Sequence, residues 1–318
     1  MRTVHMGTQA GARTGRWLRL PVGLAAVALT LASCASLGDG GDDGGLVSGS
    51  GSDESGAPFL QVVQSGGFVP MGWDFSRAPE LTVYADGRAL NHGPQIAIWP
   101  APALPNLVLS ELSDDDVAAL VESARDAGLL SDPPDYGQPP VADAPTTYVT
   151  LTVDGETYVH AAPALGIGDG TGVDGDMALG DPATGGLSEE AREGRVALAG
   201  FIAEANELVA TATTSDSYEI TAFGVMARPA AEEAVPDDTV VDPELVDPAV
   251  ERQVITWPLD LSLADASECV VVDGDEAATL LTTLGDANAA TLYEQDGVRY
   301  DTFFRPLLPH ESGCDDLT

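Results

Sequence analysis

Residues 148–159 read Tyr-Val-Thr-Leu-Thr-Val-Asp-Gly-Glu-Thr-Tyr-Val, and this stretch is the strongest indication of the class of fold. Its side chains alternate between two faces of different polarity up to Asp154-Gly155, and the alternation resumes after this dipeptide. Alternation places every second side chain on one face of a strand, and an Asp-Gly dipeptide accepts the positive φ angles of a type I′ turn. The stretch therefore predicts a β-hairpin.

Two more Asp-Gly pairs predict hairpins. One lies within residues 81–90, which read Leu-Thr-Val-Tyr-Ala-Asp-Gly-Arg-Ala-Leu, and the other lies at 296–297. With a two-residue turn at 296–297, Glu294 faces Arg299, which is a favourable cross-strand pair. Residues 218–227 are expected to form another strand.

Amphipathic helices are expected between the hairpins. Ser113 and Asp116 have the spacing of a capping box, which predicts the start of a first helix. Ser188 precedes a long apolar stripe, which predicts a second helix, and Asp273 precedes another apolar stripe, which predicts a third. The predicted class is therefore α+β, with antiparallel hairpins packed against amphipathic helices. A capped helix followed by an Asp-Gly hairpin occurs in 113–160 and again in 273–304. Two related halves and simple coincidence both remain open as explanations.

The N-terminal residues resemble a lipoprotein export signal. The first 33 residues contain four arginines and no acid. They include an apolar stretch that is shorter than the usual length of a transmembrane helix. The stretch ends in Leu31-Ala32-Ser33-Cys34, which resembles the lipobox of bacterial lipoproteins. We therefore expect Cys34 to be lipidated and to become the first residue of the mature protein. An ordinary secretory peptide and an uncleaved anchor are the alternatives.

The segment after Cys34 is polar and rich in glycine and serine as far as Ala57. It has too little apolar surface to offset the entropy lost on ordering, and as a coil it would span about 26 Å. We expect five consecutive parts along the chain. A signal peptide covers 1–33, a flexible tether 34–57, an α+β domain 58–228, an acidic Pro-rich linker or loop 229–250, and a smaller α+β unit with a disulfide 251–318.

Composition excludes several functions. The formal charge is −38, and removal of residues 1–33, with their four arginines and no acid, takes it to −42. Such a chain repels nucleic acid and anionic lipid headgroups. Lysine is absent from all 318 positions, which excludes P-loops, Schiff-base lysines and kinase-type lysines. No Gly-x-Ser-x-Gly or His-Glu-x-x-His motif is present.

Two cysteines remain once Cys34 is lipidated. Cys269 and Cys314 are an even pair in an oxidising compartment, so we predict a disulfide between them. In the chain-entropy model it would stabilise the fold by about 4 kcal/mol. A reactive thiol or metal pair is the alternative.

Few residues suggest a ligand site. Asp169, Asp174 and Asp176 lie in a glycine-rich loop and are calcium candidates, although the EF-hand pattern fails there and a solvated loop is the alternative. Apart from calcium we expect no cofactor. Arg305 is a candidate ligand contact within the run 303–311. Its alternative role is an ion pair with a nearby acid, with Phe303 and Leu307 filling a core.

Several segments resemble a known group of proteins. They are residues 66–70 and 79–88, Trp257-Pro258-Leu259, and the run from Arg305-Pro-Leu-Leu-Pro309 to Cys314. They are similar to secreted lipoproteins of high-GC Gram-positive (actinobacterial) type whose activity is not established. The resemblance covers most of the mature chain. It implies an extracytoplasmic location and one shared architecture, and it transfers no catalytic residue.

Two functions are consistent with this sequence. We expect a lipid-anchored protein on the extracytoplasmic face of the cell membrane that binds an envelope protein or wall polymer without catalysis. The alternative is an extracytoplasmic hydrolase acting on wall polymer through two carboxylates, for which Asp143, Glu156 and Glu294 are examples. Neither function involves nucleic acid. Three histidines, at 92, 160 and 310, lie far apart in the chain and are expected to have structural roles.

Overall fold

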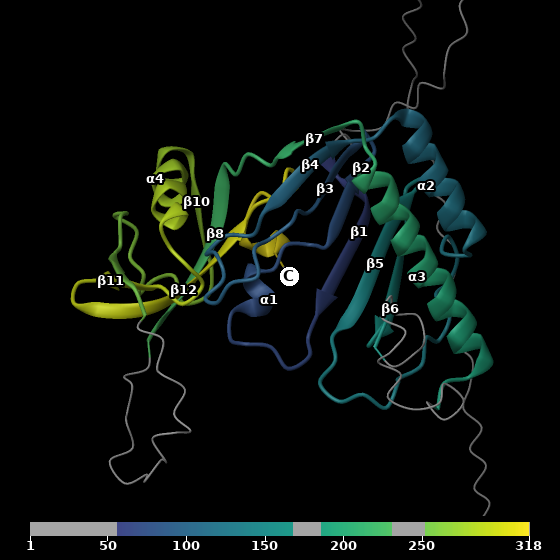
Figure 1. The fold of residues 1–318 in the computed structure, drawn as a ribbon, viewed down its shortest axis with the longest axis horizontal. Coiled ribbons are helices and arrows are strands. Elements are labelled where there is room, and N and C mark those ends of the chain that lie inside the picture. Colours follow the sequence, from purple (N-terminus) through teal and green to yellow (C-terminus); the bar gives the residue numbers. More distant parts are fainter. Residues whose placement is uncertain (1–55, 168–185, 231–251, 318) are drawn as a thin grey trace, which may run out of the picture. The chain divides into compact units, whose positions relative to one another are not determined.

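In a computed structural model of the protein, the described residues are 56–167, 186–230 and 252–317. The chain separates into residues 1–50 and a compact unit of residues 51–318, and every described residue belongs to the second. The described residues form twelve strands in two sheets, together with four α-helices (Figure 1). The predicted α+β class is thus confirmed.

The first sheet has seven strands in the order β6-β5-β1-β2-β3-β4-β7, each antiparallel to its neighbours. β1 joins parts of the chain that are distant in sequence, because Leu60 lies opposite both Val83 and Leu151. The strands are β1 (Pro58–Ser65), β2 (Leu81–Tyr84), β3 (Arg88–His92), β4 (Leu107–Glu111), β5 (Thr146–Val153), β6 (Glu156–Pro163) and β7 (Thr214–Ser217).

Helices α2 (Asp114–Asp126) and α3 (Glu189–Ala210) cover one face of this sheet (Figure 1). The predicted capping box before α2 is confirmed: the Ser113 hydroxyl accepts from the Asp116 backbone, and the Asp116 carboxylate accepts from the Ser113 backbone. The core beneath the two helices contains Leu60, Leu81, Val83, Val149 and Leu151 from the strands and Leu120, Leu198, Phe201 and Ala205 from the helices.

The second sheet has five strands in the order β10-β8-β12-β11-β9, and only β9 and β11 run parallel among these described pairs. Helix α4 (Gly274–Gly285) buries Leu280 against Phe223 and Phe304. Neighbouring side chains of a strand point to opposite faces. The strands are β8 (Ala222–Pro229), β9 (Val254–Thr256), β10 (Val270–Asp273), β11 (Leu292–Gln295) and β12 (Val298–Pro306).

A short helix, α1 (Trp73–Ser76), packs against β12. A Cβ atom added to Gly72 would lie 2.2 Å from the ring of Phe303, so only glycine fits at this approach. Phe303 and Phe304 are adjacent in β12, and Phe304 belongs to the core under α4. The α1 segment therefore lies on the face of the second sheet that points away from α4.

Strand β8 pairs with strands that follow the predicted linker. Residues 222–228 were expected in the first domain, but β8 pairs with β10 and β12 of the second sheet. The strand predicted over 218–227 is present as β8, which begins at Ala222, while the preceding β7 forms the edge of the first sheet. Local alternation predicted strand character here, whereas the partner of each strand depends on contacts distant in sequence.

The Asp-Gly turns differ in geometry. Both residues of the turns at 154–155 and 296–297 have positive φ, between 52° and 78°, as a type I′ turn requires. In the 86–87 turn only Gly87 has positive φ, 87°, and its N–H donates to the Tyr84 carbonyl over 3.1 Å. This turn is therefore longer than the two-residue turn expected from the dipeptide.

The predicted cap of α4 is wrong in one detail. Asp273 occupies the N-cap position, but its side chain makes no capping hydrogen bond. The residue is still part of β10 and pairs with Ala222, so its extended backbone is fixed by the sheet. The apolar stripe predicted after Asp273 includes Leu281, but its neighbours Leu280 and Leu284 are buried and Leu281 is exposed.

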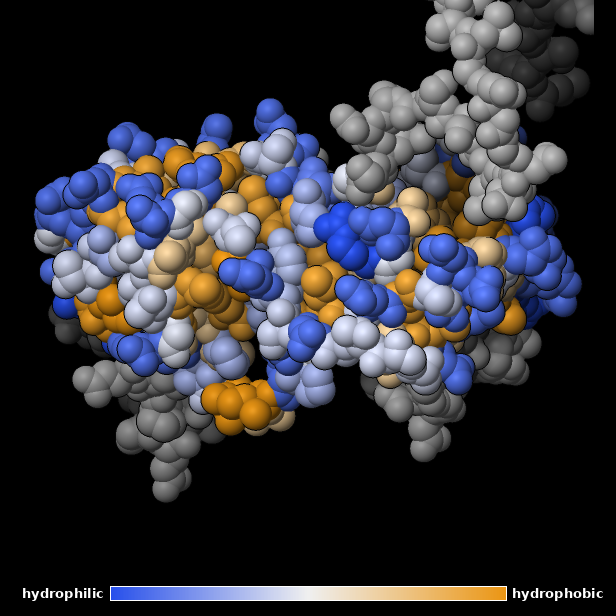
Figure 2. All heavy atoms as spheres, turned by 90° about the horizontal axis from the view of Figure 1, so that it is seen from above, coloured by the Kyte–Doolittle hydropathy of each residue, from blue (hydrophilic) through white to orange (hydrophobic). Residues whose placement is uncertain are grey.

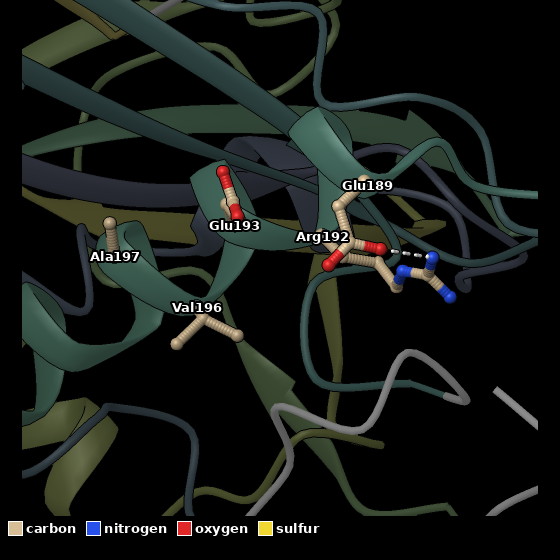
Figure 3. A pocket seen from close by; sticks show the side chains of 5 residues that line it. All are labelled: Glu189, Arg192, Glu193, Val196 and Ala197. Carbon is tan, nitrogen blue, oxygen red and sulfur yellow. Dashed lines mark hydrogen bonds and ion pairs between the residues drawn. The ribbon is translucent and has the colours of Figure 1, made fainter.

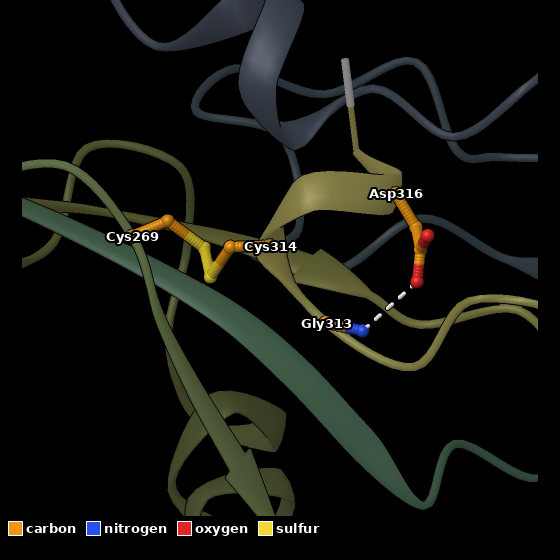
Figure 4. Close-up of a disulfide and its surroundings, with 4 residues drawn as sticks. All are labelled: Cys269, Gly313, Cys314 and Asp316. Atoms are coloured by element: carbon orange, nitrogen blue, oxygen red, sulfur yellow. Dashed lines mark hydrogen bonds between the residues drawn. A yellow bond between two sulfur atoms is a disulfide. The ribbon is translucent and has the colours of Figure 1, made fainter.

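The predicted disulfide between Cys269 and Cys314 is present, with the two Cα atoms 5.9 Å apart (Figure 4). Cys269 directly precedes β10, and Cys314 begins the 3₁₀ helix η3 (Cys314–Asp316) near the end of the chain. Gly224 of β8 lies beneath both, because a Cβ atom there would be 3.5 Å from the Cys269 sulfur. The disulfide therefore fastens the C-terminal segment to the second sheet.

Replacing both cysteines by serine should lower the free energy of unfolding by about 4 kcal/mol, because the bond closes a loop with a sequence separation of 45. Urea unfolding of the full chain measures this change. Wild-type protein unfolded in reductant is the matched control and should behave like the variant. Two titratable thiols on Cys269 and Cys314 in denatured, unreduced protein would contradict the bond.

Candidate functional site

Most of the site residues predicted from the sequence lie in parts of the chain that are not described. Cys34 and the calcium candidates Asp169, Asp174 and Asp176 fall outside the described residues. Within residues 56–167, 186–230 and 252–317, no group of three or more His, Cys, Asp or Glu side chains has the arrangement of a metal site. No helix in the described part combines the length and apolar composition needed to cross a membrane.

Arg305 is buried in an ion pair. Its side chain is 4% exposed, and its guanidinium donates to Glu311, itself 3% exposed, over 2.7 Å and to the Pro306 carbonyl. The second Glu311 oxygen accepts from the Leu308 backbone over 2.7 Å. Burial raises the pKa of Glu311 and lowers that of Arg305, while the charge of each opposes the shift in the other. Of the two roles considered for Arg305, the structure shows the ion pair with a nearby acid.

The segment containing this pair lies on the first sheet. The amide of Gln61 donates to His310 Nε2 over 3.1 Å, which leaves His310 Nδ1–H to donate to the Tyr84 hydroxyl over 2.8 Å. The Tyr218 hydroxyl donates to the Leu307 carbonyl over 2.9 Å. Tyr84 follows Val83 of the helix-covered core, so it points to the other face. Residues 305–311 therefore cover the second face of the first sheet.

The other two histidines of the described residues, His92 and His160, also have structural partners. His160 is fully buried, accepts from the Tyr136 hydroxyl over 2.7 Å and donates to the Leu129 carbonyl over 2.8 Å. Burial raises the pKa of Tyr136 to about 12. His92 Nε2 lies 3.3 Å from the Ala78 carbonyl. The histidines thus connect structural elements, as expected from their separation in the sequence.

The acids considered for hydrolysis do not form a pair. Asp143 precedes β5 and Glu156 follows it, so the eight residues of this strand hold them more than about 20 Å apart. Glycosidases need a separation of roughly 5–9.5 Å. Glu294 lies on β11 of the other sheet and faces Arg299, as predicted.

A hollow lies on the outer side of α3 (Figure 3). Its described lining comes from the first turns of this helix: Glu189, Arg192, Glu193, Val196 and Ala197. Glu189 and Arg192 form an ion pair of 2.8 Å, and the Glu189 side chain is largely in solvent. One helix face with a solvent-exposed ion pair has no assembled nucleophile or acid–base pair.

Two uncharged segments, residues 65–73 and 93–105, carry an exposed apolar surface; we call them the apolar loops. The most exposed large side chains are Phe68 at 90% and Trp99 at 79%. Of twelve exposed large apolar side chains among the described residues, six lie on these loops: Phe68, Met71, Trp73, Ile96, Ile98 and Trp99. In Figure 2 a small group of apolar side chains protrudes at one edge of a surface on which polar and apolar residues are interspersed.

The first apolar loop is held at several points. The Phe68 backbone donates to the Asp143 carbonyl over 3.0 Å, and the Arg228 guanidinium contacts the Met71 sulfur at 3.3 Å. Gly72 packs on the ring of Phe303. The loop is thus held by the segment before β5 and by β8 and β12 of the second sheet, while Phe68 and Met71 remain exposed.

The second apolar loop is closed at its base. Gly93 N–H donates to the Asn106 carbonyl over 2.8 Å, and the Asn106 amide donates to the Pro94 carbonyl over 2.9 Å. Farther along, the Ala101 carbonyl accepts from Ala289 over 2.8 Å, which fastens the loop to the segment between α4 and β11. Ile96, Ile98 and Trp99 lie between these attachments.

Topology places both loops at the same end of the first sheet. One connects β1 to β2 and the other connects β3 to β4. These four strands form a meander, in which each strand pairs antiparallel with the next one along the chain. Alternate connections of such a meander emerge at the same end. In the sequence, residues 66–70 were notable only for their resemblance to secreted lipoproteins. The missed signal in 93–105 was a charge-free run containing Ile-Ala-Ile-Trp in an acidic chain.

Comparison of the chain with protein-family models, with curated proteins and with solved structures finds no match in any of the three.

Replacing Arg305 by methionine should lower the free energy of unfolding by about 3–5 kcal/mol, because Glu311 would stay buried without its partner. The double variant Arg305→Met/Glu311→Leu should regain most of the loss, since no unpaired charge remains. Arg299→Met is the control, because Arg299 forms an exposed ion pair with Glu294 over 3.5 Å. It should lower the free energy of unfolding by less than about 1 kcal/mol. Urea unfolding measures all three. Equal losses in Arg305→Met and Arg299→Met would contradict a structural role for the buried pair.

Proposed function

We propose that this chain is a lipoprotein anchored through Cys34 on the extracytoplasmic face of the cell membrane, where its folded part binds a partner without catalysis. The anchor is inferred from residues 1–34: arginines without acids, a short apolar run and a lipobox-like ending. The resemblance to secreted lipoproteins of actinobacterial type agrees with this proposal.

The Cys269–Cys314 disulfide supports export. Such bonds persist in oxidising compartments and are rare in the cytosol. It closes the C-terminal segment over the buried ion pair, so the native arrangement of that segment depends on an oxidising environment.

The apolar loops are the observation that favours binding over catalysis. They place apolar side chains in water at one end of the first sheet, and exposed apolar patches of this kind mark interaction surfaces. The described histidines, the buried Arg305 and the buried Glu311 are all engaged in contacts within the fold.

Replacing Cys34 by alanine should release the protein from membranes into the medium, because the lipid attachment site is lost. Ser36→Ala, two residues away, is the matched control and should remain with the membrane. Fractionation followed by a high-salt wash measures the outcome. Retention of the Cys34→Ala protein in the washed membranes would contradict a lipid anchor.

A further inference from the structure

We infer that the apolar loops insert into the interfacial layer of the membrane to which the chain is anchored; this inference rests on the proposed anchor at Cys34. The occupant is a lipid surface with little net charge. The loops bring Ile96, Ile98 and Trp99 from one connection and Phe68 and Met71 from the other.

The chemistry of the loops fits a bilayer interface. Tryptophan is enriched at the boundary between headgroups and acyl chains, and isoleucine, phenylalanine and methionine partition below it. Residues 65–73 and 93–105 contain no charged residue, although the chain as a whole has a formal charge of −38. Insertion of these segments therefore desolvates no carboxylate.

The exposure of the loops argues against a second copy as occupant. Side chains as exposed as Phe68 and Trp99 protrude from the fold, and a protrusion needs a concave or deformable partner. The hollow on α3 is bordered by Glu189 and Glu193, which is a poor complement to an uncharged apolar loop. A bilayer adapts to a protrusion without requiring a matching hollow.

The length of chain between the anchor and the fold permits this contact. Pro58 begins β1, and the first apolar loop follows the other end of that strand, about 25 Å away. The segment from Cys34 to Pro58 can extend to about 80 Å. The anchor therefore does not prevent the far end of β1 from reaching the same membrane.

The anchor also explains how a weak contact becomes effective. Attachment makes insertion an intramolecular step with a high local concentration of lipid. The acidic surface opposes approach to anionic headgroups, and this repulsion is screened by salt. Insertion is therefore expected to be strongest in zwitterionic lipid and to weaken when anionic lipid is added at low ionic strength.

The test uses the full chain, isolated from cells and reconstituted into phosphatidylcholine vesicles whose acyl chains carry bromine. Co-flotation with the vesicles reports the anchor. The difference in emission between the chain and its Trp99→Phe variant isolates Trp99. Its emission should shift to shorter wavelength and be quenched by the bromine. Addition of phosphatidylglycerol at low salt should reduce the quenching.

Ile98→Asp should abolish the quenching of Trp99 without changing co-flotation. Val196→Asp is the matched control: it adds the same charge at a side chain of similar exposure, 61% against 56%, on the outer side of α3. It should leave the quenching unchanged. Circular dichroism of both variants should match that of the wild type, since both side chains are exposed.

Each outcome separates the inference from the proposed function. Co-flotation with unquenched Trp99 overturns loop insertion and leaves the anchor in place. Absence of both co-flotation and quenching overturns both proposals. A blue shift of Trp99 without vesicles, together with a doubled mass in light scattering, assigns the loops to a second copy and overturns the lipid surface. Quenching that persists in Ile98→Asp also overturns it.

Discussion

The buried ion pair between Arg305 and Glu311 is the constraint on which the arrangement of the two sheets depends. Two charges removed from water must stay together, because either one alone is strongly destabilising. Arg305 belongs to β12 of the second sheet, and Glu311 lies in the segment that follows. Their contact turns this segment back, so that Leu307 is buried and Leu308 packs with Tyr84 and Leu90 of the first sheet.

This turned segment determines what else can pack. His310 contacts Tyr84 and Gln61 of the first sheet, and the disulfide at Cys314 holds the far end to the second. Phe303, two residues before Arg305, receives the backbone of Gly72. The first apolar loop therefore rests on the same strand that carries the buried ion pair. Loops held by backbone contacts lose little entropy on binding.

The sequence predicted those parts of the fold that depend on neighbours along the chain. The capping box at Ser113 was predicted because its two residues lie three positions apart. The facing pair Glu294 and Arg299 was predicted because a short turn sets its register. The partners of β1 and β8 were not, since strand alternation does not identify a pairing partner distant in the chain.

The same limit applies to the candidate site. For Arg305 the sequence allowed two roles, a ligand contact and an ion pair with a nearby acid. Tyr84 and Tyr218 lie close enough to affect its pKa, and no local pattern connects either of them to it. The charge-free run 93–105 was visible in the sequence, but whether its apolar side chains were core or surface required the structure.

Differential scanning calorimetry of the full chain tests most directly whether residues 305–314 join the two sheets into one unit. If they do, the chain should unfold in a single transition whose calorimetric and van't Hoff enthalpies agree, and reduction of the disulfide should lower the temperature of that whole transition. Two separable transitions, with only one of them sensitive to reductant, would show that the sheets unfold independently and would contradict the coupling.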